Sequence, residues 1–275
     1  MTRPVRLVSV GRVEGFAVSQ SDDLVAVEEP LEIRLGARSF SVTMRTPGND
    51  LELAAGFLFS EGILRDAADI RSLRSLDVDA NIVEVQLVQD SEPRPAPAER
   101  ALPITSACGV CGKASLDELA FNRCPVLARD GLRVNPSVIC QLPGRLREAQ
   151  AVFEATGGLH AAALFTVEGA LQSVREDVGR HNAVDKLVGA ALLNRLTPLA
   201  DSLMLVSGRA SFELVQKALV AAIPILAAVG APSSLAVSTA ERCGMTLIGF
   251  LRGEHFNVYA HSYRIVGMEQ CASLH

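Results

Sequence analysis

The chain has 275 residues, of which 49% are hydrophobic, and this is enough for one large domain or two modest ones with a full core. Its formal net charge of -5 excludes a general nucleic-acid binder, which carries a basic excess to neutralise phosphates. Six cysteines in a chain of this length do not form the dense framework of a secreted disulfide protein, so we expect a reducing compartment.

The N-terminal stretch is charged and contains no apolar run of signal-peptide length, so we expect a cytoplasmic protein. Residues 4–45 contain several strand-like runs. The last of them, 31–44, alternates apolar and polar residues around a turn at Gly36. This pattern predicts an antiparallel sheet at the start of the chain.

A helix is predicted next, after the helix-breaking residues 46–49. Asn49 or Asp50 can cap a helix over residues 50–61 that ends near Gly62. A further strand is predicted at 82–88. These elements indicate a smaller, β-rich N-terminal part, which we place at residues 1–139.

A polar stretch containing four prolines follows and leads into residues 105–115. Pro93, Pro95, Pro97 and Pro103 are incompatible with a helix or a central strand. The stretch is either a surface loop between strands or an arm that lets the residues after it travel, and the sequence favours neither interpretation.

The segment T-S-A-C-G-V-C-G-K-A-S at 105–115 is the most informative part of the chain. Cys108 and Cys111 are each followed by a glycine, which lacks a Cβ and lets the backbone turn the thiol outward. Lys113 supplies a positive charge that favours a thiolate. Two thiols at this spacing can share a metal, form a disulfide or hold a sulfur atom in transit, or they can pack as small hydrophobes.

From about residue 140, predicted strands and helices alternate. This order requires crossover connections and a parallel or mixed sheet with helices on both faces, so we predict an α/β domain over 140–275. The longest apolar run, 218–229, is interrupted by Pro224 and is too short to cross a bilayer, so we expect no membrane partner. The predicted strands are 159–167, 170–177, 202–207, 223–229 and 245–251, and the predicted helices are 182–194, 210–222 and 233–243.

Polar residues follow the predicted strands of this second half. In such sheets, ligands collect at the carboxyl ends of the strands. Glycine beside serine at a helix start exposes backbone N–H groups, and arginine supplies forked donors, so these loops suit a phosphate-bearing ligand. The chain has neither G-x-G-x-x-G after a strand nor G-x-x-x-x-G-K-[ST], the signatures of dinucleotide and P-loop folds. The four segments are 174–182, 207–211, 230–234 and 252–255.

Two histidines lie near these loops. His181, beside Arg180, either contacts the ligand or is a satisfied polar residue at a helix start. His160 enters an apolar strand, and we interpret it as a core or strand-end residue.

Three known kinds of protein use cysteine pairs of this spacing, and each requires other sequence features as well. A zinc site needs four ligands, and the pair has no second pair nearby. A thioredoxin-like protein places its thiols at a strand-to-helix junction, whereas these follow a proline-rich stretch. A zinc nucleobase deaminase needs H-x-E and P-C-x-x-C, which the chain lacks. We therefore predict no metal site and favour sulfur transfer through an exposed cysteine, with zinc binding and dithiol redox chemistry as alternatives.

Six segments, in this order, closely resemble the formate dehydrogenase accessory sulfurtransferase (FdhD) family. The resemblance covers about residues 25–265 and departs from the family at none of the motif positions. The segments are R-T-P-G-N-D-L-E-L-A-A-G-F-L-F-S-E-G-I, T-S-A-C-G-V-C-G-K, T-G-G-L-H-A-A-A-L-F, R-E-D-V-G-R-H-N-A-V-D-K, S-G-R-A-S-F-E-L-V-Q-K and M-T-L-I-G-F-L-R-G.

The resemblance implies a cytoplasmic homodimer that takes sulfur from a cysteine desulfurase. It passes that sulfur to molybdenum in the bis-(molybdopterin guanine dinucleotide) cofactor, a step required for formate dehydrogenase activity. It implies that Cys108 carries the persulfide. The spacing of the pair lets Cys111, the second candidate catalytic residue, protect or resolve that persulfide, although the chemistry does not require a second cysteine. The resemblance also implies a second domain like cytidine deaminase, three-layered (α/β/α), without the zinc site. A cofactor-binding chaperone that handles no sulfur is the other function that we consider.

The resemblance places the cofactor at residues 250–255. The guanine dinucleotide carries phosphates, which agrees with the loops described above. The candidate cofactor-binding residues are Phe250, Leu251, Arg252, Gly253, Glu254, His255, Arg180, His181, Arg209, Ser211 and Lys217.

Overall fold

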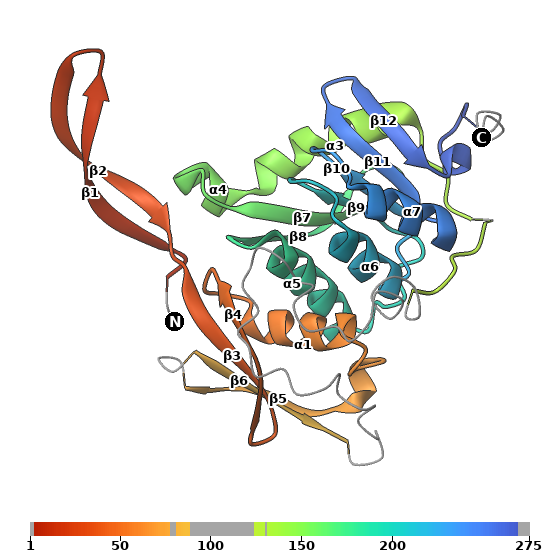
Figure 1. The fold of residues 1–275 in the computed structure, drawn as a ribbon, viewed down its shortest axis with the longest axis horizontal. Helices are drawn as coiled ribbons and strands as arrows, with labels where there is room; N and C mark the ends of the chain where they lie inside the picture. The colour runs from red at the N-terminus through yellow and green to blue at the C-terminus, as the bar shows by residue number, and fades with distance from the viewer. Residues whose placement is uncertain (1–2, 78–80, 89–123, 130, 269–275) are drawn as a thin grey trace.

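The computed structural model describes residues 3–77, 81–88, 124–129 and 131–268 (Figure 1). Its body contains a four-stranded sheet and a six-stranded sheet with helices between and beside them, and a separate two-stranded hairpin extends away from this body. Within the described residues, no helix is both long and apolar enough to span a membrane.

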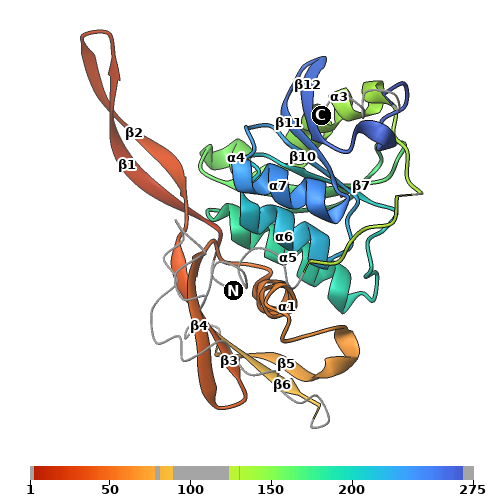
Figure 2. The same ribbon diagram turned by 45° about the vertical axis from the view of Figure 1, so that its right-hand side comes forward.

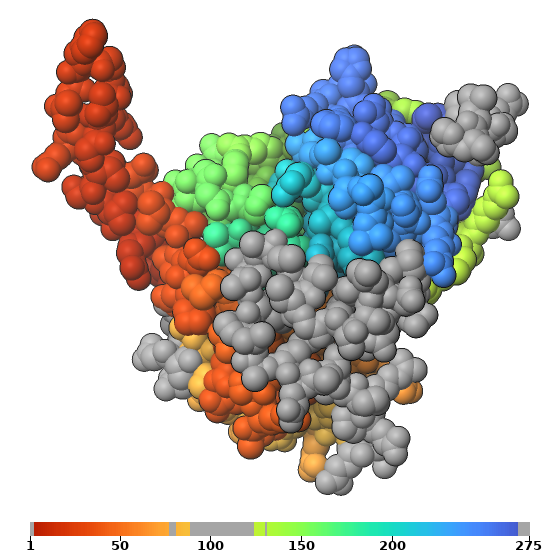
Figure 3. Space-filling model, in the orientation of Figure 1, coloured from red at the N-terminus to blue at the C-terminus, as the bar shows by residue number. Residues whose placement is uncertain are grey.

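The hairpin consists of the first two strands. β1 (Val5–Glu14) and β2 (Ala17–Ala26) pair antiparallel along their whole length, which confirms the antiparallel start. The pair forms an arm that protrudes from the body (Figures 2 and 3), and the side chains of Val13 and Phe16 are exposed at its outer end.

The four-stranded sheet has the order β4-β3-β6-β5. β3 (Glu29–Leu35) and β4 (Arg38–Arg45) form the predicted hairpin, with Gly36 at a φ of 56° in its turn. β6 (Ile82–Leu87) pairs parallel with β3. β5 (Ile70–Asp77), which follows the short helix η1 (Ala67–Asp69), pairs with β6 and forms the edge opposite β4.

Helix α1 (Asp50–Ser60) confirms the predicted helix and covers this sheet. Leu53 and Leu58 pack with Ile33 and Val83 in one buried cluster. The far side of α1 packs against α5 (Arg180–Leu193). Glycine is required there, because a Cβ added to Gly56 would lie 1.9 Å from the carbonyl oxygen of Asp185. The backbones of α1 and α5 thus approach each other directly.

The six-stranded sheet has the order β12-β11-β10-β9-β7-β8. β9, β10 and β11 are parallel, whereas β7 and β12 run antiparallel to their neighbours. This mixed sheet confirms the α/β class. Its strands are β7 (His160–Phe165), β8 (Leu171–Asp177), β9 (Leu203–Val206), β10 (Ile225–Ala228), β11 (Thr246–Arg252) and β12 (His255–Ala260).

Helices cover both faces of this sheet (Figure 1). On one face, α5, α6 (Phe212–Val220) and α7 (Ser234–Cys243) share a core with α1 and the four-stranded sheet. On the other face, α3 (Pro136–Ala149) forms a second core with the alternate residues of the strands. The domain therefore has three layers, as expected. Its likeness to cytidine deaminase remains an implication of the resemblance.

Several elements have no counterpart among the predicted ones. They include β5, β12, α3 and the short α4 (Ala151–Thr156). The division that we drew between residues 139 and 140 falls inside α3. One hydrophobic core also joins α1 and the four-stranded sheet to α5, α6 and α7, so this core includes residues from both predicted parts. The division into two domains stays a prediction.

Candidate functional site

The predicted polar loops lie together at one edge of the six-stranded sheet. β9, β10 and β11 are parallel, and β8 runs in the same direction because both β8 and β9 are antiparallel to β7. Their carboxyl ends therefore share an edge, and α5, α6 and α7 start there. We call this edge the rim and define it as residues 178–181, 207–211, 229–234 and 250–255.

Backbone hydrogen bonds fasten three of the four rim segments to one another. Gly230 N donates to Gly208 O at 2.9 Å, and Phe250 N donates to Gly230 O at 3.0 Å. Ser233 N donates to Ala210 O at 3.0 Å. Because main-chain groups make these bonds, the backbones of these three segments are held at fixed positions relative to one another.

Two of the three helices that begin at the rim have uncapped N-termini. The N-cap residues of α5 and α6, Gly179 and Ser211, make no side-chain cap to a helix amide within the described residues. In α7, by contrast, the Oγ of Ser233 accepts from Ala236 N at 3.2 Å. Uncapped N–H groups of a helix first turn attract anions. The start of α5 is thus suited to an anionic group, whereas the first turn of α6 already holds the carboxylate of Glu213, which accepts from its own backbone N–H.

Two predicted arginines stand beside these helix starts. Arg180 is the first residue of α5, and its Nε is buried without a hydrogen-bond partner among the described residues. A buried donor without a partner costs about 1–3 kcal/mol, so this nitrogen suits an acceptor on a ligand. Arg209 packs beside Gly230, where an added Cβ would lie 3.1 Å from the arginine Cγ. The structure brings both arginines to the rim.

His181 and Ser211 join the α5 and α6 starts. The Oγ of Ser211 lies 3.5 Å from the Nε2 of His181, and the Oε2 of Glu213 lies 3.7 Å from the same nitrogen. The interaction with His181 is the main cause that lowers the pKa of Glu213 to about 2, against the opposing effect of its partial burial. Glu213, which was not among the candidates, holds the imidazole at the rim.

His160 also lies at this edge, because β7 begins where its neighbours end. A Cβ added to Gly208 would lie 3.4 Å from the Nδ1 of His160. Burial is the main cause that lowers the pKa of His160, and the positive charges of Arg180 and His181 lower it further. His160 is the strand-end residue that we expected, but its place beside the predicted rim residues was missed.

The segment 250–255 forms the turn between β11 and β12. Arg252 pairs with His255, so Gly253 and Glu254 make a two-residue connection at the rim. Phe250 has a φ of 54° and is 43% exposed. A bulky residue in this left-handed region is strained, and such strain clusters at functional sites.

Two of the candidates have buried side chains. The side chain of Leu251 is 0% exposed and belongs to the core beneath the sheet, because alternate residues of a strand face opposite sides. Lys217 lies inside α6, where its Nζ donates to both carboxylate oxygens of Asp185 at 2.7 and 2.8 Å. Ser60 of α1 donates to the same carboxylate at 2.9 Å. Lys217 is therefore part of the packing between α1, α5 and α6.

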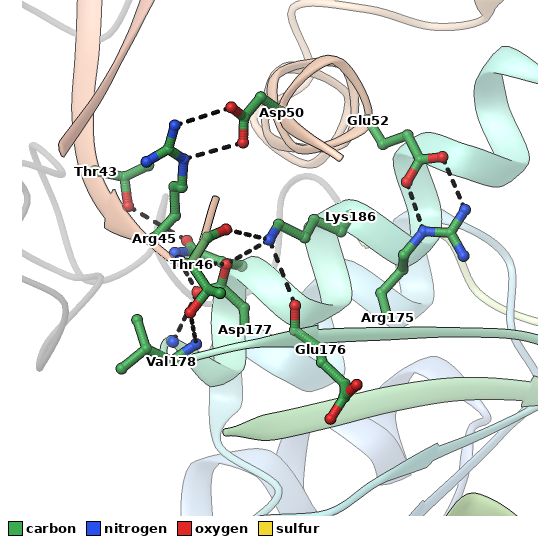
Figure 4. Close-up of polar contacts among 12 residues, drawn as sticks. Thr43, Arg45, Thr46, Asp50, Glu52, Arg175, Glu176, Asp177, Val178 and Lys186 are labelled. Carbon is green, nitrogen blue, oxygen red and sulfur yellow. Dashed lines mark hydrogen bonds and ion pairs between the residues drawn. The ribbon is translucent and has the colours of Figure 1, made fainter. Parts of the chain in front are cut away.

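A second polar cluster is buried at the end of β8, where it meets the segment after β4 and the first two turns of α5 (Figure 4). The Nζ of Lys186 lies 2.7 Å from the Oδ2 of Asp177, and these side chains are 2% and 0% exposed. Asp177 also accepts from the backbone of Thr46 at 3.1 Å and from the amide of Asn182 at 3.0 Å. Lys186 donates to Thr46 O at 2.8 Å. We call these four residues the clamp.

Two further ion pairs flank the clamp (Figure 4). Arg45 donates to both carboxylate oxygens of Asp50 at 3.0 and 2.9 Å. Arg175 donates to both oxygens of Glu52 at 2.5 and 2.8 Å, which joins β8 to α1. Two of the segments that carry the family resemblance, one beginning at Arg45 and the other at Arg175, thus bind each other.

The predicted catalytic residues, Cys108 and Cys111, lie outside the described residues. The described chain stops at Val88 and resumes at Cys124.

The fold and the rim together define a mixed-sheet α/β protein with polar loops gathered at the carboxyl edge of its larger sheet. The model of the FdhD/NarQ family matches residues 26–266 of the chain. This protein belongs to the FdhD/NarQ family, which confirms the resemblance.

Relatives in several organisms match nearly the whole chain. A protein of Streptomyces coelicolor named sulfur carrier protein FdhD is 52% identical and covers 96% of this chain and 97% of its own length. A protein of the same name from Sulfurisphaera tokodaii is 47% identical, covering 95% and 99%. The crystal structure of a protein from Desulfotalea psychrophila, described as a formate dehydrogenase accessory protein, is 28% identical, with a TM-score of 0.78 over 96% of this chain and 100% of that one.

Proposed function

We propose that this protein accepts sulfane sulfur from a cysteine desulfurase as a persulfide on Cys108. It transfers that sulfur to the molybdenum of the bis-(molybdopterin guanine dinucleotide) cofactor, bound as substrate at the rim. The relatives named as sulfur carriers support the carriage of sulfur. The observation that carries the rim assignment is the uncapped start of α5 at Arg180, whose buried Nε has no hydrogen-bond partner among the described residues.

The rim residues fit a ligand that carries phosphates and flat bases. The N–H groups at the start of α5 and the two arginines supply donors for phosphate oxygens. The exposed ring of Phe250 supplies an aromatic face of the kind on which bases stack. Arg252 and His255 border the same turn. The proposed ligand-binding set therefore keeps the predicted residues apart from Lys217 and the side chain of Leu251.

The first chemical step takes place at Cys108. Its thiolate attacks the terminal sulfur of the donor persulfide, and a new S–S bond forms on Cys108 as the S–S bond of the donor breaks. The donor sulfur leaves as a thiolate with the electron pair of that bond. Cys111 protects or resolves the persulfide, and the molybdenum of the bound cofactor is the acceptor in the next step. At the rim, Glu213 holds the imidazole of His181 beside Ser211.

The proposal assigns the partners and the setting. A cysteine desulfurase is the donor, and formate dehydrogenase is the client that receives the sulfurated cofactor. The description of the Desulfotalea psychrophila protein as a formate dehydrogenase accessory protein supports this client. We place the reaction in the cytoplasm and expect a homodimer.

Peptide mapping tests the persulfide step. The protein is incubated with a cysteine desulfurase and cysteine, then digested without reductant. We expect a labile gain of about 32 Da, one sulfur atom, on Cys108. Cys108→Ala should abolish sulfur transfer, whereas Cys111→Ala should leave measurable transfer.

The alternatives give different results in the same experiment. Absence of the adduct, or an adduct confined to Cys243 or Cys271, contradicts the proposal. Full maturation of formate dehydrogenase by the Cys108→Ala variant would show a chaperone that handles no sulfur. Stoichiometric zinc on the purified protein would show a metal-binding cysteine pair.

A further inference from the structure

His160 places an imidazole directly beside the rim. It is the first residue of β7, which runs antiparallel to β8 and β9, so it lies at the edge where those two strands end. Its side chain is half-buried, and within the described part of the chain its ring takes part in no hydrogen bond or ion pair. Neither ring nitrogen is therefore used by the described fold, and the proposed function assigns His160 no contact with the ligand.

The backbone holds this ring in place from both sides. His160 is opposite Asp177 in the register of β7 and β8. Toward β9, Ser207 N donates to Ala161 O at 2.9 Å, and Ala161 N donates to the Oγ of Ser207 at 2.9 Å. The ring lies against Gly208, where an added Cβ would be 3.4 Å from the Nδ1 and 3.5 Å from the Cε1 of His160. The imidazole is therefore held between the ends of β8 and β9, against a residue that has no side chain.

The charges that act on this ring come from α5 and β8. Burial lowers the pKa of His160 most, and the positive charges of Arg180 and His181, at the start of α5, lower it further. Asp177 at the end of β8 has the opposite effect on this pKa, but its carboxylate is already paired with the Nζ of Lys186 at 2.7 Å. The ring is therefore mostly neutral at about pH 7 and lies in a positive field.

Two charged residues on neighbouring elements complete these surroundings. Arg209 follows directly after Gly208, the residue against which the ring lies. Glu213 of α6 lies 3.7 Å from the Nε2 of His181, so its negative charge is balanced by that histidine. An anion that binds beside His160 therefore meets two arginines, while both neighbouring carboxylates are already paired.

We propose that His160 contacts the phosphate-bearing ligand of the rim and donates a hydrogen bond to a phosphate oxygen. The inference rests on the proposed function, because it takes the rim as the place where that ligand binds. The phosphate brings the opposite charge that the ring lacks, and an opposite charge within about 4–6 Å favours the protonated imidazole. One proton then passes from the solvent to the free ring nitrogen, and no bond of the ligand breaks. Ligand binding is thus linked to proton uptake by this histidine.

Nuclear magnetic resonance of the full chain follows this proton directly. The Cε1–H signal of His160 is assigned as the one that is missing from His160→Gln, and it is titrated against pH with and without guanosine diphosphate. We expect the signal to titrate at a higher pH in the presence of the nucleotide. If the nucleotide binds and the signal titrates at the same pH in both states, the inference about His160 is overturned and the rim assignment stands.

Calorimetric titration of guanosine diphosphate tests the same contact through affinity. The nucleotide's own ionisation affects the parent and His160→Gln equally, so the ratio of their dissociation constants isolates His160. We expect the variant to bind at most about threefold more weakly at about pH 8 and about tenfold or more weakly at about pH 6, where the parent ring takes up a proton. A loss of affinity that is the same at both pH values would show a structural role and overturn the inference.

His261→Gln is the matched control. His261 is also a half-buried histidine, but it follows β12 at the opposite edge of the sheet, where its Nε2 lies 2.6 Å from Glu241 O. This variant should bind guanosine diphosphate as the parent does at both pH values. An equal pH-dependent loss in His261→Gln would contradict the assignment to His160. Failure of the parent to bind the nucleotide at either pH would contradict the rim assignment and this inference together.

Discussion

The rim and the clamp are built from neighbouring residues and differ in how completely their polar groups are paired. Asp177 and Lys186 in the clamp are buried and bonded to each other and to the backbone or side chains around them. One turn of chain away, Arg180 has a buried Nε without a partner among the described residues, and the helix that it starts is uncapped. A single motif, R-E-D-V-G-R-H-N-A-V-D-K, thus supplies both a structural joint and a candidate binding surface.

This difference shows that membership of a distinctive motif does not by itself assign a residue to a ligand. Lys217 illustrates the point, because it lies in a motif segment and its ammonium group is paired with the carboxylate of Asp185. Unpaired donors at an open helix start are the better guide, since a native structure keeps them at a cost.

The largest expected effect is on the clamp. Lys186→Met leaves the carboxylate of Asp177 buried without its cation, and removal of one partner of a buried pair costs about 3–5 kcal/mol. Urea unfolding should show this loss in the free energy of unfolding. The double variant Lys186→Met with Asp177→Asn carries no unpaired charge and should be less destabilised than the single one. A loss below about 1 kcal/mol in Lys186→Met would remove the distinction between clamp and rim.

A smaller effect is expected from Glu213 at the rim. Its pKa is lowered to about 2 from an ordinary 4.5, chiefly by the hydrogen bond with His181, so the bonds that the carboxylate accepts stabilise the fold above about pH 4.5, and this contribution is lost as the pH falls toward about 2. We expect a contribution below about 1 kcal/mol, because the pair is partly solvated. Glu213→Gln should abolish this part of the pH dependence, as measured by urea unfolding across that range. An identical pH profile for the two proteins would contradict the pairing.

Much of the fold follows from local pattern in the sequence. The alternation over 31–44 around Gly36 predicted the β3–β4 hairpin, and the cap and apolar residues after position 49 predicted α1. The apolar runs after residue 140 predicted the strands that flank α5, α6 and α7. Because strands followed by crossover helices place their ends at one edge, the position of the rim was also predictable.

What the sequence did not reveal depends on tertiary packing. Helix α3 contains Pro143 in its interior, which argues locally against a helix, but its apolar residues pack under the sheet. The ion pair of Lys217 with Asp185 joins different helices, and no local signal shows it. Leu251 was a different case, since strand alternation alone places it on the face opposite Phe250.

The central claim, that the rim binds the ligand while the clamp holds the fold, is tested most directly by titration of guanosine diphosphate as a probe of the guanine dinucleotide. By calorimetry, Arg180→Ala should weaken binding about tenfold or more while changing the free energy of unfolding by less than about 0.5 kcal/mol. Arg147→Ala, which removes a half-exposed arginine at the end of α3, should bind as the parent does. Unchanged affinity in Arg180→Ala, or a loss of affinity matched by a loss of stability, would contradict the claim.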